Sequence, residues 1–372
     1  RHVPAGRSVI LYVLRYWPTL TETFVHDEIR AVARHLPVEV AAFDPRGDPH
    51  AEPPPARVHA RPHRWGWLPA LPSLVGEGAR GPAAARVLWL TTLVRRAERV
   101  HVHFAGEAAA WTREACRRAG VPYGVTVHAV DLFKPRPDLA AILRDADVVV
   151  TISEHNRRLL RERYDVDAVV VRCGVALAAR ATPSQPPVVL GVGRWVPKKG
   201  LDTLAAIAPR LPDAVVRLVS DAPALPGVDV RGLLPRAEVA AELGRATLFA
   251  LPCRTAPDGD QDGIPVALLE AMAAGLPVVT TAVSGIPEIV DEAVGWVVPP
   301  DDPEALLRAV RAALLDPAEA ARRGAAGRAR LRERGFHAED THAAMVALLG
   351  GTAARVVPAR TSGYGADRSG TP

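Results

Sequence analysis

Residues 188–200 read VVLGVGRWVPKKG, an apolar run followed by a Gly-x-Gly turn and a basic segment. The apolar run predicts a buried strand, and Gly191 and Gly193 let the backbone turn sharply and approach a ligand closely. The helix expected next would present unpaired N–H groups, and Arg194 and Lys199 would add two positive charges. The segment therefore predicts a strand–turn–helix unit that binds a diphosphate.

Two details of this segment narrow the choice of ligand. A dinucleotide fingerprint would place a third glycine at position 196, where this chain has Val196, so a nicotinamide cofactor is not expected. Lys198 and Lys199 are two of only three lysines among 46 cationic residues. Because a lysine ammonium is a compact point charge that arginine does not replace, the pair suggests a function. Taken alone, the segment could also be a tight turn with solvated lysines.

Strand-like and helix-like segments alternate on both sides of this unit. Continuous Val and Ile runs between amphipathic helices are typical of parallel sheets covered on both faces. A chain of 372 residues, 48% of them hydrophobic, suits two such domains of about 150 to 200 residues each. The sequence therefore predicts an α/β protein of two doubly wound, Rossmann-like domains, residues 1–180 and 181–350, with a ligand cleft between them. Residues 351–372 are expected to form a disordered tail.

The composition limits the environment of the protein. No apolar run approaches the roughly 18 residues that a membrane span needs, and three scattered cysteines suit neither a disulfide framework nor a zinc site. These features predict a cytoplasmic protein. Residues 44–82, rich in Pro, Gly and Arg, predict a long excursion over the surface. Trp65 and Trp67 within it could stack on a sugar or cover the core.

Two carboxylates mark a second chemical segment, DGIPVALLEAMAAG at residues 262–275. Asp262 precedes a predicted helix and Glu270 lies inside it, about 12 Å further along if the whole segment is helical. That span would let one carboxylate reach a sugar hydroxyl and the other a ribose, with the diphosphate between them. Glu270 is the exception in an otherwise apolar helix and needs a partner, so a structural ion pair is the alternative.

Taken together, these segments resemble family 4 of the retaining glycosyltransferases, which share the GT-B fold. The upstream segments are similar to family members that build exopolysaccharides or natural products. The segments that carry the resemblance are YWPTLTETFVHDEI (16–29), HVHFA (101–105), VTVHAVDLF (125–133), GRWVPKKGLDTL (193–204), DGIPVALLEAMAAGLPVV (262–279) and SGIPEIV (284–290).

The resemblance implies transfer of a sugar from a nucleotide diphosphate to an acceptor hydroxyl, with retention, by front-face attack and without metal or cofactor. It implies that Arg194 and Lys199 neutralise the leaving diphosphate and that Glu270 holds the ribose. Asp262 stands where the family usually has its first Glu, near the transferred sugar. The further residues implied are His128 beside the sugar; Gly193, Gly285, Ile286 and Glu288 along the donor; and Thr21, Glu22, His103 and Asp131 on the acceptor side, where Asp131 orients the region around His128.

The chain departs from the family pattern in two places. Asp262 is one methylene shorter than the usual Glu. The usual Gly-Asp-Gly-Pro turn is replaced by Ser-Asp-Ala-Pro at residues 220–223, and the short connection to Gly232 predicts that a helix is missing there. Two alternatives therefore stay open. One is a nucleotide-sugar epimerase or a sugar phosphorylase of the same fold; the other is a non-catalytic partner subunit that only binds nucleotide-sugar.

Two motifs could indicate a metal, but no metal is expected. Asp258-Gly-Asp260 resembles a metal-binding Asp-x-Asp, yet it lies in a polar loop and is expected to be solvated. His101 and His103 alternate on a strand, so one would line the cleft while the other packs.

The charge is distributed unevenly. Residues 1–180 hold 26 Lys plus Arg against 19 Asp plus Glu, a net of +7, whereas residues 181–372 hold 20 against 22, a net of −2. The expected partners are a nucleotide-sugar donor and a small-molecule, glycan or lipid-linked acceptor, but no nucleic acid. The excess of positive charge in residues 1–180 suggests an anionic acceptor, or peripheral contact with the inner face of an anionic membrane.

Overall fold

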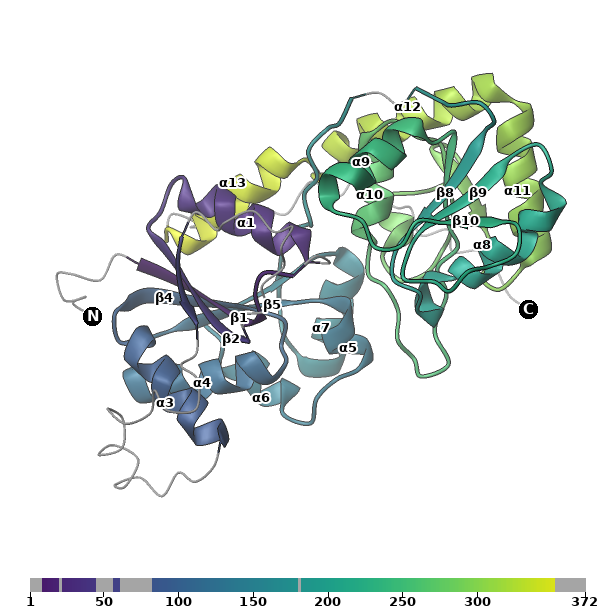
Figure 1. The fold of residues 1–372 in the computed structure, drawn as a ribbon. Coiled ribbons are helices and arrows are strands. Elements are labelled where there is room, and N and C mark those ends of the chain that lie inside the picture. Colours follow the sequence, from purple (N-terminus) through teal and green to yellow (C-terminus); the bar gives the residue numbers. More distant parts are fainter. Residues whose placement is uncertain (1–8, 20–21, 45–55, 61–81, 180–181, 352–372) are drawn as a thin grey trace, which may run out of the picture.

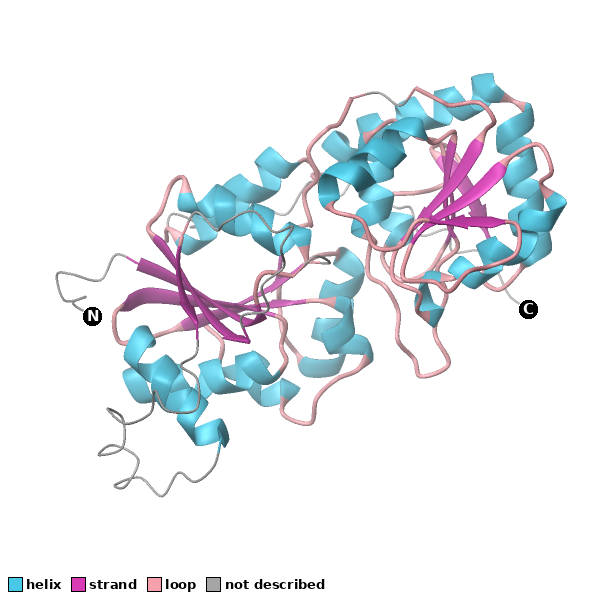
Figure 2. Cartoon of the chain, in the orientation of Figure 1, coloured by secondary structure: helices cyan, strands magenta, loops and turns pink. Residues whose placement is uncertain are grey.

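A computed structural model of the chain describes residues 9–19, 22–44, 56–60, 82–179 and 182–351. Two α/β domains lie side by side, each with helices on both faces of a parallel sheet (Figures 1 and 2). The predicted α/β class and the two Rossmann-like domains are confirmed. Trp65, Trp67 and almost all of the expected tail lie outside the described residues.

The N-terminal sheet has seven parallel strands in the order β3-β2-β1-β4-β5-β6-β7. From β1 the chain adds β2 and β3 on one side of the sheet and then β4 to β7 on the other side, as in a doubly wound fold. The strands are β1 (Val9–Tyr16), β2 (Val38–Asp44), β3 (Arg57–Ala60), β4 (Ala97–His103), β5 (Tyr123–Val127), β6 (Val148–Thr151) and β7 (Val169–Val170).

Six helices accompany this sheet in the described part of the N-terminal domain. They are α1 (Thr23–Ala33), α3 (Pro82–Val94), α4 (Glu107–Ala119), α5 (Ala129–Phe133), α6 (Leu139–Asp145) and α7 (Glu154–Tyr164). Strand β3 is a correction, because it lies within the stretch that was expected to be a surface excursion. It pairs in parallel with β2 at the sheet edge, with His59 opposite Ala41.

The C-terminal sheet repeats the arrangement with six parallel strands in the order β10-β9-β8-β11-β12-β13. Its strands are β8 (Val188–Val192), β9 (Val215–Val219), β10 (Val228–Val230), β11 (Leu248–Leu251), β12 (Val278–Thr281) and β13 (Gly295–Val298). The accompanying helices are α8 (Leu201–Ile207), α9 (Arg236–Arg245), α10 (Val266–Ala273), α11 (Pro303–Leu315) and α12 (Pro317–Glu333).

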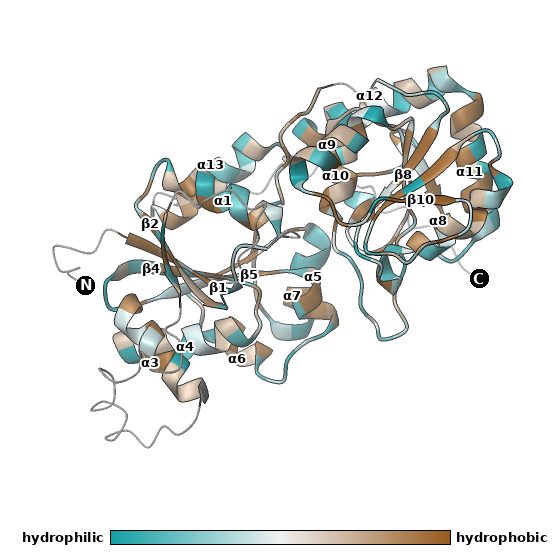
Figure 3. Ribbon diagram, in the orientation of Figure 1, coloured by the Kyte–Doolittle hydropathy of each residue, from teal (hydrophilic) through white to brown (hydrophobic). Residues whose placement is uncertain are grey.

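Burial explains why these segments are strands. All five residues of β8, all four of β11 and all four of β12 are buried, as expected for strands with helices on both faces. Most strand residues of both sheets are hydrophobic, while polar residues gather on the outer helices (Figure 3). As the sequence suggested, no helix joins β9 to β10 across residues 220–227. Among the described helices, none is both long and apolar enough to cross a bilayer.

The last described helix, α13 (Ala338–Leu349), corrects the domain boundary expected at residue 350. It lies beside α1 on the N-terminal domain (Figure 1). Met345 and Leu349 are buried there in one cluster with Tyr12 and Ile29. The apolar pattern of the helix predicts a buried face but does not predict which domain covers that face. The helix was therefore assigned to the C-terminal domain, with its neighbours along the chain.

Packing of α13 on the N-terminal domain should contribute measurably to stability. Leu349 is 4% exposed, whereas Leu315 at the end of α11 is 83% exposed. We expect Leu349→Ala to lower the free energy of unfolding by roughly 2 to 5 kcal/mol, because it leaves a cavity in the core. The matched Leu315→Ala should change it by less than about 0.5 kcal/mol. Urea unfolding of both variants measures the difference, and equal effects would contradict this docking of α13.

Candidate active site between the domains

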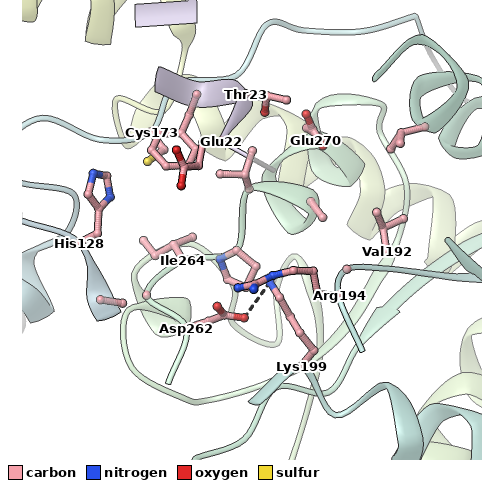
Figure 4. Close-up of a pocket in the computed structure, with 18 of the residues that line it drawn as sticks. Glu22, Thr23, His128, Cys173, Val192, Arg194, Lys199, Asp262, Ile264 and Glu270 are labelled. Carbon is pink, nitrogen blue, oxygen red and sulfur yellow. Dashed lines mark ion pairs between the residues drawn. The ribbon is translucent and has the colours of Figure 1, made fainter. Parts of the chain in front are cut away.

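A cavity of about 340 Å³ lies between the two domains and is lined by both. His128, Glu22 and Phe24 line it from the N-terminal domain. In Figure 4, His128 and Glu22 face residues of the C-terminal domain across the cavity. The side chains that the C-terminal domain contributes include Arg194, Lys198, Lys199, Asp262 and Glu270. The sequence predicted an interdomain cleft. Seven of the predicted site residues border this cavity: Glu22, His128, Gly193, Arg194, Lys199, Asp262 and Glu270.

The turn after β8 is held in a conformation that only glycine allows. Gly200 has a φ of +64°, and a Cβ at this position would lie 1.9 Å from the Pro252 carbonyl oxygen. The carboxylate of Asp221 accepts a hydrogen bond from the Trp195 N–H at 2.6 Å. These contacts fix the basic turn against the end of β11, with Lys199 directed into the cavity.

Lys199 and Asp262 form an ion pair inside the cavity (Figure 4). The Lys199 Nζ lies 2.8 Å from Asp262 Oδ2, and the two side chains are only 15% and 14% exposed. Lys198 Nζ lies 3.6 Å from the other carboxylate oxygen, and the Cys253 thiol donates to Oδ2 at 3.9 Å. The sequence had assigned Asp262 and Lys199 to different parts of the donor and did not predict their pairing.

The pairing sets the charge of both groups. Burial alone would raise the pKa of the Asp262 carboxyl, but the ammonium groups of Lys199 and Lys198 outweigh it and hold that pKa below its usual range. Burial would likewise lower the pKa of Lys199, but Asp262 raises it above the usual value. Both groups are therefore charged at neutral pH, and the cavity retains a buried cation.

The Asp-x-Asp loop is solvated at Asp258, as expected, whereas Asp260 is ion-paired and largely buried. Lys198 Nζ lies 3.1 Å from Asp260, and Lys134 of the N-terminal domain lies 2.6 Å from Asp258 and 3.5 Å from Asp260. Only Asp258 is mostly exposed. The loop thus uses its carboxylates to hold Lys198 in place and to contact the other domain.

Glu270 lies in α10 and lines the cavity, as the Asp262–Glu270 spacing required. Burial raises the pKa of its carboxyl, and Arg236 is the nearby cation that opposes this shift. Arg236 also borders the cavity and pairs with Asp27 of the N-terminal domain at 2.6 Å. Nothing in the sequence around Arg236 singled it out.

Two comparisons with known proteins bear on the family. The profile described as Glycosyltransferase Family 4 matches residues 21–179, and the profile described as Glycosyl transferases group 1 matches residues 186–316. Together they cover most of the chain. The chain belongs to glycosyltransferase family 4. The first profile ends at Ala179 and the second begins at Pro186, on either side of the boundary expected between residues 180 and 181.

Relatives agree with this assignment. An Escherichia coli K12 protein assigned to colanic acid biosynthesis as a glycosyltransferase is 31% identical over 249 residues, covering 58% of this chain and 61% of that protein. A GDP-mannose-dependent α-(1-6)-phosphatidylinositol monomannoside mannosyltransferase of Mycolicibacterium smegmatis is 32% identical over 228 residues, covering 52% and 59%. The chain therefore aligns with less than two thirds of either relative's length.

A solved structure shares the fold of this family 4 chain. The Anabaena HepE structure in complex with UDP-glucose superposes with a TM-score of 0.73 at 18% identity, covering 93% of this chain and 100% of that one. At this identity the match supports the GT-B fold alone.

The N-terminal side of the glycosyltransferase cleft is more deeply buried than expected. His128 is 5% exposed and borders the cleft, and the Asp131 carboxylate accepts a hydrogen bond from its N–H at 2.9 Å. Burial raises the pKa of Asp131 to about 6. His101 and His103 are both buried, and His103 borders only a second, smaller cavity, so neither lines the cleft directly. Thr21 lies outside the described residues.

The expected donor contacts at Gly285, Ile286 and Glu288 lie elsewhere in the structure. These residues do not border the cavity, and Ile286 is fully buried. The Glu288 carboxylate accepts hydrogen bonds from the N–H groups of Glu154 and His155 at the start of α7, and pairs with Arg172 at 2.7 Å. The structure thus gives Glu288 a contact between the domains, which sequence neighbours alone could not reveal.

The Asp262–Lys199 pair predicts a defined pH dependence. Because the folded pKa of Asp262 is lowered, its contribution to stability is complete above the ordinary value near 3.8 and is lost as pH falls through the folded pKa. Asp262→Asn should lower the free energy of unfolding by roughly 3 kcal/mol at pH 7, because Lys199 loses its charged partner. The gap between parent and variant should narrow below about pH 4.

The control is Asp213→Asn, which changes an exposed carboxyl of the same domain and should shift stability by less than about 0.5 kcal/mol. Urea unfolding across pH 3 to 7 makes the comparison. A gap between parent and Asp262→Asn that stays constant down to pH 3 would contradict the assigned ion pair.

Proposed function

We propose that this glycosyltransferase takes its sugar from a nucleotide diphosphate and transfers it to an acceptor hydroxyl with retention and without a metal ion. The observation that supports the proposal most is the Lys199–Asp262 pair beside Arg194 at the end of β8. The mannosyltransferase relative is named as GDP-mannose-dependent, and the HepE structure contains UDP-glucose. Both are consistent with such a donor.

Lys199 can serve the diphosphate while it stays paired with Asp262. An ammonium has three N–H donors, and Asp262 occupies one of them. The remaining donors and the Arg194 guanidinium stabilise negative charge that develops on the leaving phosphate. Asp262 raises the pKa of Lys199 and keeps this cation charged in a buried position. Positive side chains thus do the work that a metal ion would otherwise do.

Carboxylates on either side of the cation hold the two ends of the donor. Asp262 lies beside the diphosphate site and reaches the transferred sugar, whereas Glu270, further along α10, binds the ribose hydroxyls. His128 borders the sugar from the other domain. In the proposed mechanism the acceptor hydroxyl attacks from the side of the leaving phosphate, and that phosphate takes the proton of the hydroxyl.

The acceptor enters from the N-terminal domain. Glu22 lines the cavity there, and burial raises the pKa of its carboxyl. The N-terminal half carries the excess of positive charge, which favours an anionic acceptor or one held at an anionic membrane surface. The name of the mannosyltransferase relative, whose acceptor is a phosphatidylinositol mannoside, agrees with this choice. We therefore place the enzyme at the inner face of the cytoplasmic membrane.

Acceptor-dependent release of nucleoside diphosphate tests the proposed reaction. The purified chain, incubated with GDP-mannose or UDP-glucose and anionic glycolipid acceptors, should release diphosphate only when acceptor is present. EDTA should leave the rate within about two-fold, since Lys and Arg supply the positive charge. Release that needs phosphate would favour a phosphorylase, and a changed sugar without release would favour an epimerase. No turnover by any donor–acceptor pair would support the non-catalytic subunit.

Replacement of the buried lysine tests the donor site. Lys199→Met removes the charge but retains much of the volume, so the Kd for the nucleoside diphosphate should rise at least tenfold, the value of one charged hydrogen bond. Lys134→Met is the matched control because Lys134 is 43% exposed and pairs with Asp258 away from the cavity lining. Isothermal titration calorimetry of both variants measures the affinities. Equal affinity of Lys199→Met and the parent would remove Lys199 from the donor site.

A further inference from the structure

All three lysines of the chain meet the same loop of the C-terminal domain. Among 46 cationic residues, the only lysines are Lys134, Lys198 and Lys199. Their partners are three alternate aspartates, Asp258, Asp260 and Asp262. Two of the lysines belong to the same domain as these aspartates, whereas Lys134 belongs to the N-terminal domain. The series of ion pairs therefore crosses from one domain to the other.

The lysines and aspartates alternate in space. Lys134 Nζ lies 2.6 Å from Asp258 and 3.5 Å from Asp260. Lys198 Nζ lies 3.1 Å from Asp260 and 3.6 Å from Asp262. Each of these two ammonium groups bridges two carboxylates, which suits a compact cation with three N–H donors better than a planar guanidinium. The series continues into the cavity through the buried ion pair described above.

The loop that carries the aspartates has a fixed shape. The Ala256 N–H donates to the Asp260 carbonyl at 2.8 Å, and the Gly259 N–H donates to the Ala256 carbonyl at 2.9 Å. Oδ1 of Asp258 accepts a hydrogen bond from the Asp260 N–H at 3.2 Å, while its Oδ2 pairs with Lys134. One carboxylate thus closes the turn and contacts the other domain, so the loop and Lys134 are held together.

On the other side of the domain boundary, a short helix joins Lys134 to the cleft. Helix α5 begins after His128, which borders the cavity, and ends where the Lys134 N–H donates to the Val130 carbonyl at 2.9 Å. The Arg163 guanidinium donates to the Leu132 carbonyl at 3.1 Å and holds the helix on its own domain. Figure 1 shows α5 on the side of this domain that faces the other one. A force on Lys134 is therefore transmitted to His128.

The helix and the loop also touch beside the cleft. A Cβ on Gly263 would lie 3.2 Å from Ile152 Cδ1 and 3.5 Å from the Ala129 Cβ, both of the N-terminal domain. Residues 258–263 thus contact the N-terminal domain at two points. One is the close packing of Gly263 at the cleft, and the other is the pair of contacts that Lys134 makes further out.

The outer contact is charged and exposed. The side chains of Lys134 and Asp258 are 43% and 59% exposed, and an exposed ion pair stabilises a structure only slightly. Lys134 lowers the pKa of the Asp258 carboxyl, which in turn raises the pKa of Lys134, so both groups are charged at neutral pH. Neutralising one of them would have a small effect, whereas reversing its charge would place like charges opposite each other.

We propose that Lys134 and Asp258 are positioning residues that set the spacing across the cleft between His128 and the buried ion pair. Their contact fixes α5 against the loop, so the acceptor side of the cleft faces the donor side at a defined distance. The effect on catalysis rests on the proposed function, because only transfer needs both sides. The proposed diphosphate contacts all come from the C-terminal domain, so diphosphate affinity should not depend on Lys134.

A zero-length cross-link tests the contact in the parent protein and needs no activity. A carbodiimide activates a carboxylate, and a lysine amine in contact with that carboxylate displaces a urea to form an amide. Because the chain has only three lysines, mass spectrometry of the digested protein identifies the linked residues. We expect an amide between Lys134 and Asp258 at low ionic strength, with a lower yield at about 1 M salt, which screens exposed charges. Absence of this amide would overturn the proposal.

Exchange of the two charges tests the positioning role. We expect Lys134→Asp to lower kcat roughly tenfold while the Kd for GDP or UDP stays within about two-fold, because like charges push α5 away from the loop. Asp258→Lys should act in the same way. The double variant, Lys134→Asp with Asp258→Lys, should recover a kcat within about threefold of the parent, because opposite charges face each other again.

Small-angle X-ray scattering makes the same comparison without activity. Lys134→Asp should have a larger radius of gyration than the parent, and the double variant should return to the parent value. Arg210→Asp is the matched control, because Arg210 is 46% exposed and pairs with Glu304 inside the C-terminal domain, away from the cavity lining. This control should leave both kcat and the radius of gyration unchanged.

Parent-like kcat and radius of gyration in Lys134→Asp would overturn the positioning role. So would a double variant that is no closer to the parent than the single variants. The two proposals fail separately. The amide and the expected radii in a chain without transferase activity would refute the proposed function alone. Transferase activity that neither charge reversal affects would refute this inference alone.

Discussion

The buried ion pair of Lys199 and Asp262 is the interaction on which the cleft depends. A buried ammonium without a partner would lose its proton or destabilise the fold, so the cation that the proposed diphosphate donor needs can exist only beside a carboxylate. The fold supplies both from adjacent strand ends: Lys199 follows β8, and Asp262 lies in the loop after β11. Gly200 makes this approach possible, since any side chain there would collide with the Pro252 carbonyl.

Charged contacts also relate the two domains to each other. Glu288 joins the start of α7 and Arg172, Arg236 pairs with Asp27, and Lys134 reaches the Asp258 loop. Helix α13 returns to the N-terminal core and ties the end of the chain to its beginning. Ion pairs, unlike a large apolar interface, exchange partners with water at modest cost, which suits the proposed entry of a donor and release of a product.

The sequence predicted local features well and distant contacts poorly. Val-rich runs and the Gly-x-Gly turn depend on neighbours in the chain, so the sheets and the basic turn were recognised. The side of the fold on which α13 packs depends on residues more than 300 positions away, Tyr12 among them. The same holds for Glu288, which was expected at the donor and instead contacts α7. His103 was expected near the acceptor, but its partners are Glu28 and His128.

The proposed donor site is a cavity between the domains that is built around a phosphate-binding cation. The affinity of the parent chain for a nucleoside diphosphate, compared with that for the same nucleoside without phosphates, tests it most directly. Calorimetric titration with GDP against guanosine, and with UDP against uridine, makes the comparison. We expect at least one diphosphate to bind 100-fold or more tightly than its nucleoside, a difference worth about two charged hydrogen bonds. Equal affinity of diphosphate and nucleoside in both pairs would contradict it.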